Sequence, residues 1–463
     1  MQLSDLFRRK PIGGEPDSLH RTMGLLQLVM LGIGATIGTG IFVALTTAVP
    51  EAGPAVTVAF VLAGITAGLT ALCYAELASI IPASGSAYSY TYATLGEFVA
   101  FVVGSCLLLE YAVSTSAIAV GWGQYLNELL FDVGGWRMPD AIAQPPGAGG
   151  VVNLPAVFLV LMCAVLLLRG AKESMLVNAI LVAAKLAVLV FFIVMAFTAF
   201  SAENLRPFAP LGVAGIGAAA SSIFFSYIGI DTVSTAAEEV KDPERNLPLG
   251  IVLSLVIVTG VYILVALAAV GAQPWEQFEG QDAGLAVILR NITGASWPSL
   301  VLCLGAIASI FSITLVTIYG QTRILYAMSR DGLMPKVMQK LDSQGAPRIN
   351  TIVVAVTIAT LAALVPLDVL VNLTSMGTLI AFGIVSAAVL ILRRTRPDLQ
   401  RKYKVPLYPL LPVASVLFCL YLIRNLPWDT YLLFGLWIAV ACVFYFSYGF
   451  RHSKLAKARQ AKV

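Results

Sequence analysis

The segment MLGIGATIGTGIF, residues 30–42, places four glycines and two threonines inside an apolar run. Glycine in a helix interior costs about 1 kcal/mol relative to alanine, so the helix is expected to unwind near residue 37. The half-helix that follows would begin with free N–H groups, which bind anions such as a carboxylate. The alternative is close helix packing, because small residues four apart, such as Gly34 and Gly38, also let helices touch.

A second apolar run, SSIFFSYIGIDTVSTAAEE at residues 221–239, is interrupted by polar residues and a glycine around residue 228. Backbone groups without partners cost several kcal/mol each in hydrocarbon, so such a break persists only where something polar satisfies them. Paired discontinuous helices in two halves of a chain are typical of a transporter's binding site. The two breaks together therefore predict a site where glycines give a ligand access to the backbone.

Two ionisable residues lie in the middle of apolar segments, Lys185 in VAAKLAVLVFF and Glu110 in LLLEYAVSTS. A charge at the centre of a bilayer is expensive and indicates function. Lys185 either gains and loses a proton during transport or is a fixed ammonium bound by carbonyls of the first span. Glu110 either pairs with a basic substrate side chain, directly or through water, or only fixes geometry through an internal partner. The candidates for that partner are Thr39, Lys185 and Asp231.

The elements that must position these residues are membrane helices. The 463 residues are 59% hydrophobic and 12% charged, with a mean hydropathy of +0.87. Soluble domains carry about 25% charged residues, and the short alternating segments of a β-barrel are absent from the sequence. Twelve stretches are long enough to span a bilayer: 25–49, 55–81, 96–130, 152–168, 173–200, 212–237, 248–271, 297–328, 349–365, 369–392, 407–424 and 429–449. The predicted fold class is an all-α polytopic membrane protein.

The lysines and arginines support this number of spans. If the N-terminus is cytoplasmic, four arginines lie in loops outside the cell: Arg137, Arg206, Arg290 and Arg424. Lys185 lies within a span, and all the other lysines and arginines are cytoplasmic. Cytoplasmic loops are rich in lysine and arginine, so both termini are expected inside. The net charge of +4 thus reflects topology, and no nucleic acid partner is expected. The first 23 residues lack a signal-peptide pattern, and the six cysteines are expected to be buried and reduced.

The two breaks divide the chain into two units of five spans, each opening with a broken helix. Because five is odd, the second unit enters the membrane from the opposite side, which makes the units inverted repeats. The expected organisation is a cytoplasmic segment at 1–23, a first repeat at 24–200, a second repeat at 201–392, two further spans at 393–449 and a basic cytoplasmic tail at 450–463.

Four blocks resemble the amino acid–polyamine–organocation permeases: GIGATIGTGIF, PASGSAYSYTYATLGE, FFSYIGIDTVSTAAEEVKDPERNLPLGI and YGQTRILYAMSRDGLMP. They look most like bacterial relatives of the cationic amino acid transporters, and the resemblance covers roughly residues 20–450. It implies the five-plus-five inverted-repeat fold of the leucine-transporter type, with two extra C-terminal helices. Lys185 resembles a built-in substitute for the sodium ion of sodium-coupled relatives.

The resemblance also implies how a substrate binds. Its carboxylate would lie on the amides of Gly38, Thr39 and Gly40. Its ammonium would lie on carbonyls near the second break, with a contribution from the first; the candidates are Phe225, Ser226, Ile228, Ile33 and Thr36. Phe225 would act as a lid, the alternative being core packing.

Further residues have proposed roles in or beside this site. Thr317 would line the pocket and help set substrate size, or else form an interhelical hydrogen bond. Asp231 would cap the second half-helix or carry a proton. Glu76 is expected to anchor cytoplasmic loops, and Arg323, Arg330 and Asp331 are expected in a gate at the inner side.

The predicted function is secondary active transport of L-amino acids across the cytoplasmic membrane by alternating access, coupled to protons. The alternatives are an exchanger of amino acids against amino acids or polyamines, and a sensor that binds without transport. No GxxxxGK[ST] motif and no nucleophile–base pair occur, so neither an ATP-driven pump nor an enzyme is expected. We expect no cofactor or metal, and as partners the L-amino acid, protons and membrane lipids, with a monomer as the functional unit. Small neutral and cationic substrates remain open.

Overall fold

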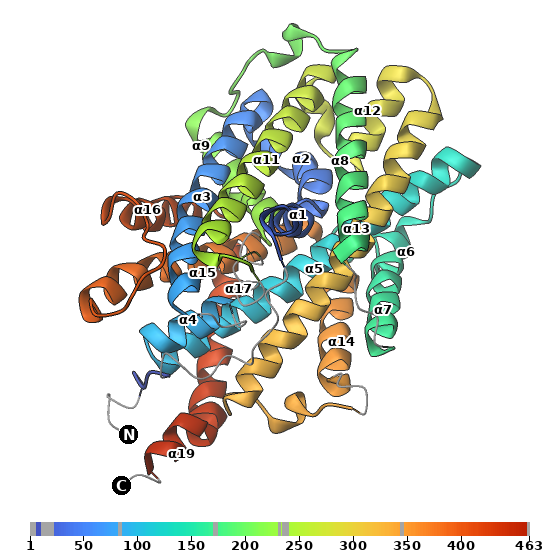
Figure 1. Ribbon diagram of the computed structural model, residues 1–463. Coiled ribbons are helices and arrows are strands. Elements are labelled where there is room, and N and C mark those ends of the chain that lie inside the picture. The colour runs from blue at the N-terminus through green and yellow to red at the C-terminus, as the bar shows by residue number, and fades with distance from the viewer. Residues whose placement is uncertain are drawn as a thin grey trace.

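The computed structural model describes residues 6–10, 23–81, 86–169, 175–229, 233, 240–342 and 347–460. Helices are the only extended regular elements in these ranges (Figure 1). Seven helical segments of the described residues are long and apolar enough to cross a membrane, and shorter apolar helices accompany them. The predicted all-α class is therefore confirmed, whereas the number of twelve crossings and the inverted repeat stay predictions.

Every predicted apolar stretch coincides with one or more helices. They are α1 (Leu25–Thr36), α2 (Thr39–Ala52), α3 (Val56–Ile80), α5 (Glu97–Gly134), α7 (Leu154–Leu168), α8 (Met175–Phe197), α9 (Gly212–Ile223), α11 (Pro243–Ala272), α13 (Ser296–Arg330), α14 (Arg348–Leu364), α15 (Leu367–Thr395), α16 (Leu410–Arg424) and α17 (Trp428–Phe444). Short helices connect or extend them: α4 (Ser86–Thr94), α6 (Asp140–Ala143), the 3-10 turns η4 (Phe224–Tyr227) and η5 (Trp275–Phe278), α12 (Gly284–Thr293) and α19 (Lys454–Gln460).

Both predicted helix breaks are present. The first helix ends at Thr36, Ile37 is extended, and Gly38 precedes the start of α2. The second helix changes from the α-helix α9 to the 3-10 turn η4, which ends at Tyr227. Ile228 is then extended, and Gly229 has a φ of +97°. The continuation of the second break, which includes Asp231, lies outside the described residues. The breaks at residues 37 and 228 thus fall where the glycine and polar positions predicted them.

The broken helices lie inside the bundle. α5 crosses the middle of the molecule obliquely in the view of Figure 1. α2 packs along α9, and α1 packs against α8 and α11. α8, α11 and α13 pack against α1, and α2, α3, α9 and α15 pack against η4, so packed helices cover the described parts of both breaks. This enclosure keeps membrane lipid away from the unwound backbone, as such backbone requires.

Residues 6–10 and α19 meet at one end of the bundle, here called the terminal face. Lys10 Nζ lies 2.8 Å from Asp331 Oδ1, and the Lys454 N–H donates to the Asp331 carbonyl at 3.1 Å. The Tyr88 hydroxyl donates to Asp331 Oδ2 at 2.9 Å. The network expected from Arg323, Arg330 and Asp331 is therefore wrong in its partners. Asp331 is bound by α4 and by both end segments of the chain, which only the tertiary fold brings together.

Glu76 anchors a loop at the same face, as the sequence predicts. Its carboxylate is 1% exposed and accepts a hydrogen bond from Arg393 Nε at 2.8 Å. It also accepts the Val405 N–H at 2.7 Å, and Arg401 Nε lies 3.5 Å away. One carboxylate thus ties the C-terminal end of α3 to the end of α15 and to the loop that follows it.

Glu76→Gln is expected to destabilise the protein by about 2–3 kcal/mol, because it leaves two partly buried arginines without their counter-charge. The measurement is the unfolding midpoint in detergent, from thermal or denaturant titration. Asp398→Asn is the matched control, since Asp398 pairs with Arg396 at 3.2 Å on the exposed surface. The control should leave the midpoint unchanged. Equal midpoints for the two variants would contradict the anchoring role.

Candidate functional site

The two unwound segments touch through their backbones. A Cβ placed on Gly40 would lie 2.5 Å from the Cα of Ser226, and one on Gly229 would lie 2.3 Å from the Ala35 carbonyl oxygen. Both distances are far below a van der Waals contact, and the atoms met are backbone atoms, which cannot swing away. Glycine at these positions therefore allows the crossing of the two breaks. The close-packing alternative is correct for Gly40.

Tyr262 of α11 joins the two breaks through its hydroxyl, and sequence reasoning missed it. The hydroxyl oxygen lies 2.9 Å from the Thr36 carbonyl oxygen and 3.1 Å from the Ser226 carbonyl oxygen. The side chain is fully buried. Its one hydrogen can be donated to only one carbonyl at a time. A tyrosine within an apolar helix was the available signal, because a buried tyrosine hydroxyl needs a partner.

The carbonyls predicted to hold an ammonium are not empty acceptors. The Ile33 carbonyl accepts the Ile37 N–H at 2.8 Å, and the Phe225 carbonyl accepts the Ile228 N–H at 3.3 Å. The expectation of free carbonyls at Phe225 and Ser226 is therefore corrected: each already accepts one hydrogen bond. A carbonyl oxygen has two lone pairs, so each retains capacity for a second donor.

Lys185 lies where the sequence suggests, against the first broken helix. It is 3% exposed on α8, and its ammonium donates to the Gly34 carbonyl of α1 at 3.2 Å. Gly34 is within one turn of the break. A cation on α8 is thus bonded to the backbone of the unwinding helix, which both interpretations of Lys185 require. Its titration stays a prediction.

The other predicted residues have the following places. Glu110 is buried on α5. A Cβ added to Gly377 of α15 would lie 3.7 Å from the Cβ of Glu110, so α15 passes close to it. Thr317 donates to the Ile313 and Thr314 carbonyls of its own helix at 3.0 and 3.1 Å, rather than to another helix. The Thr36 hydroxyl likewise donates to the Gly32 carbonyl at 2.8 Å. The side chain of Thr39 lies outside the described residues.

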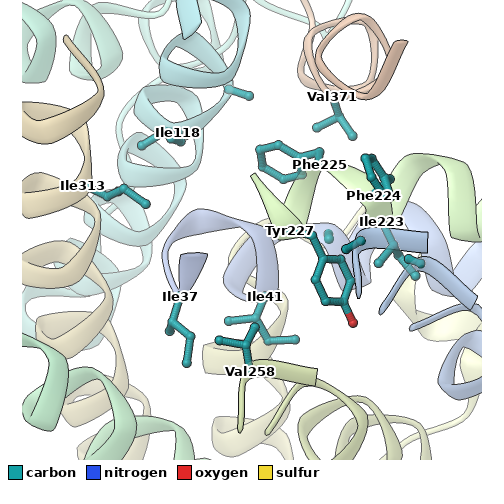
Figure 2. Packing of buried hydrophobic residues seen from close by; sticks show 14 of the residues in the cluster. Ile37, Ile41, Ile118, Ile223, Phe224, Phe225, Tyr227, Val258, Ile313 and Val371 are labelled. Carbon is teal, nitrogen blue, oxygen red and sulfur yellow. The ribbon is translucent and has the colours of Figure 1, made fainter. Parts of the chain in front are cut away.

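Apolar side chains form the walls around the first break. Figure 2 shows Ile313 of α13, Ile118 of α5 and Phe225 of η4 around the turn between α1 and α2. A Cβ on Gly38 would lie 2.4 Å from Ile313 Cδ1. Val371 of α15 stands beside Phe225 (Figure 2). Phe225 is 4% exposed, and its N–H donates to Ser375 Oγ at 3.1 Å, so it is held by α15.

Two buried hydroxyls near this region lack a hydrogen-bond partner among the described residues. They belong to Ser226 at the second break and to Ser309 on α13, which are 1% and 2% exposed. Buried polar groups are nearly always paired, so orphaned ones favour a missing polar ligand or water. Ser226 lies directly at the crossing of the two breaks.

Comparison with known proteins agrees with this geometry. Residues 23–446 match the family model described as amino acid permease. The chain is 42% identical to the branched-chain amino acid permease BcaP of Bacillus subtilis, over 97% of this chain and 99% of that protein. It is 40% identical to the methylthioribose transporter of the same organism, over 98% and 100%. It is 37% identical to the vacuolar cationic amino acid transporter 4 of Arabidopsis thaliana, over 86% and 68%.

Proposed function

Because the chain belongs to the amino acid permease family of the amino acid–polyamine–organocation superfamily, we propose that it transports L-amino acids by proton-coupled secondary transport. It is a multi-pass membrane protein and a permease rather than an enzyme. The observation that carries the proposal is the crossing of two helix breaks beside a buried lysine. Unwound backbone and a buried ammonium are both unfavourable in a purely structural bundle, and both suit a charged ligand.

The proposed architecture has twelve spans in the cytoplasmic membrane, with both termini in the cytoplasm. Spans one to five and six to ten form inverted repeats that move against one another in alternating access. Three observations support it: helices at every predicted stretch, a break in the first and sixth, and a terminal face shared by residues 6–10 and α19. The distribution of lysine and arginine supports a cytoplasmic location for this face.

In the proposed binding mode, the first break binds the carboxylate of the α-amino acid, and carbonyls of both breaks bind its ammonium. The substrate carboxylate lies at the start of α2, where the first N–H groups of a helix have no partner within it. The ammonium lies at the carbonyls of Thr36, Ser226 and Ile228. Tyr262 orients two of these carbonyls from behind, and Phe225 closes over the ligand. A zwitterion thereby satisfies both ends of the interrupted helices.

The side chain is proposed to be aliphatic, as in leucine, isoleucine or valine. The residues around Gly38 that support this are apolar, namely Ile313, Ile118 and Phe225. The relative BcaP, which is named a branched-chain amino acid permease, agrees in substrate class. A cationic substrate is the second candidate, supported by buried Glu110 and by the similarity to a cationic amino acid transporter.

Proton coupling is assigned to Lys185. Protonated, its ammonium holds the Gly34 carbonyl and keeps α1 against α8. Deprotonated, the amine attracts that carbonyl much less, because charge-assisted hydrogen bonds are roughly twice as strong as neutral ones. Loss of the proton would thus release α1 toward the cytoplasm, which links proton release to opening of the site.

The test is uptake of labelled leucine into proteoliposomes with and without an acid-outside gradient, with arginine as competitor. Accumulation that needs the gradient and resists arginine is the expected result. Inhibition by arginine would replace the aliphatic substrate with the cationic one. Uptake that ignores the gradient and needs amino acid inside would identify an exchanger. Binding without any transport would identify a sensor.

Tyr262→Phe is expected to weaken leucine binding about tenfold, because one of two buried carbonyls loses its donor. The dissociation constant from calorimetry is the measurement. Tyr445→Phe is the matched control: its hydroxyl is as deeply buried, but it donates to Glu97 Oε1 at 3.0 Å, away from the breaks. Equal losses of affinity in both variants would show that Tyr262 acts through general stability.

A further inference from the structure

A chain of hydrogen bonds runs from Phe225 to a carboxyl group at the far end of α2. The Phe225 N–H donates to Ser375 Oγ at 3.1 Å, and the Ser375 hydroxyl donates to the Ser222 carbonyl at 3.4 Å. The Ser222 hydroxyl oxygen lies 3.3 Å from Glu51 Oε2 and 3.3 Å from Asn372 Oδ1. These hydrogen bonds join α2, α15 and the segment formed by α9 and η4.

The single hydrogen on the Ser222 hydroxyl bears on the protonation state of the Glu51 carboxyl. Ser222 Oγ carries one hydrogen, yet two oxygen acceptors lie at equal distance from it. An ionised carboxylate and an amide oxygen can only accept. One of the two contacts therefore lacks a hydrogen unless the carboxyl of Glu51 or a rotated amide of Asn372 supplies it. With a proton on Glu51, its O–H donates to Ser222 and the Ser222 O–H donates to Asn372.

The surroundings of Glu51 also favour the neutral carboxyl. The residue is half-buried, and the described residues give it no ion pair. A partly buried carboxylate without a cation is costly. α9, packed along α2, has no charged side chain. Among the charged groups at this end on the other elements, Arg290 binds Glu128 and Asp132, and Asp282 accepts from Gln124 and Gln144. The remaining ones are exposed: Arg137, Asp140, Glu203, Arg206, Glu276, Glu279, Asp368, Arg424 and Asp429.

We propose that Glu51 is a protonation site that holds Phe225 closed over the bound amino acid. The inference deepens the proposed transport function and rests on it. Glu51 does not reach the substrate; it is a positioning residue that acts through Ser222, Ser375 and the backbone of Phe225. In the proposed topology this end of α2 faces the exterior, so an external proton completes the chain and favours occlusion of substrate. Loss of the proton turns the Ser222 O–H toward Glu51 and removes its bond to Asn372. α2 and α9 are then no longer tied to α15 at this point, which frees the lid.

The experiment is leucine exchange in proteoliposomes with the same pH on both sides, with the apparent KM measured at mildly acidic and at mildly alkaline pH. The wild-type KM is expected to rise on the order of tenfold at alkaline pH, the effect of one lost buried hydrogen bond. Glu51→Gln keeps a donor toward Ser222 and should hold the low KM at both pH values. Glu51→Ala and Ser222→Ala should show the high KM at both.

Glu276→Gln, an exposed carboxyl at the same end, is the matched control and should keep the wild-type pH profile. A wild-type KM independent of pH, or an unchanged profile in Glu51→Gln, would overturn the role of Glu51. In particular, Asn372 rotated so that its NH₂ donates to Ser222 would give a pH-independent wild-type KM. Absence of leucine exchange in the wild type would instead overturn the proposed function. Glu51→Gln keeps the side-chain shape, so the inference remains testable if Glu51→Ala does not fold.

Discussion

Lys185→Ala is expected to abolish accumulation of leucine driven by a proton gradient. The substitution removes the buried ammonium and leaves the Gly34 carbonyl without this donor. No protonatable group then remains at this contact between α8 and α1, so the gradient cannot act there. Binding should weaken about tenfold, the effect of one lost buried hydrogen bond, and not vanish. Uptake with an acid-outside gradient and calorimetric binding in detergent are the two measurements.

Lys185→Gln separates the charge from the hydrogen bond. A glutamine amide can donate to Gly34 but does not titrate, so this variant should bind leucine better than Lys185→Ala and still fail to accumulate it. Lys336→Ala, at an exposed lysine of the terminal face, is the control for a lost surface charge. Full gradient-driven uptake by Lys185→Ala would refute the proton role and reduce Lys185 to a fixed structural charge.

Gly40→Ala is expected to weaken leucine binding by roughly 5- to 150-fold. The added methyl group would lie 2.5 Å from the Cα and 2.6 Å from the Cβ of Ser226, so one of the two breaks must shift. Ser226 cannot retreat easily, because its carbonyl is bonded to Tyr262. Inserting a methyl group into such a contact costs about 1–3 kcal/mol, and here the cost falls on the binding geometry. Binding by calorimetry and the unfolding midpoint distinguish loss of the site from loss of the fold.

Gly260→Ala is the matched control, because Gly260 also lies in an apolar helix, α11, and a Cβ there meets nothing within 4 Å. It should bind leucine normally and gain about 0.5–1 kcal/mol of stability, since alanine is the better helix former. Gly38→Val tests the carboxylate position separately: the nearest atoms to its Cβ would be side-chain atoms of Ile313, with Cδ1 at 2.4 Å and Cγ2 at 3.2 Å, rather than backbone. Unchanged leucine affinity in Gly40→Ala would show that substrate binds away from the crossing.

The sequence by itself determined the helices, their two interruptions and the family. Helix formation in a membrane depends on the length and polarity of local segments, and unwinding depends on the glycines and polar residues within them. These are properties of neighbouring residues, so the breaks near residues 37 and 228 could be located without coordinates. The deep positions of Lys185 and Glu110 followed from the same local logic.

Only the tertiary structure decided which groups meet. Gly32 faces Ser254 and Gly40 faces Ser226, although both glycines belong to one motif, because helix rotation and crossing set what each one touches. The hydroxyl of Tyr262 reaches both breaks from a third helix, and Glu51 reaches Ser222 from the end of α2. Such hydrogen bonds join residues far apart in the chain. Their partners depend on the packing of whole helices, which no local pattern specifies.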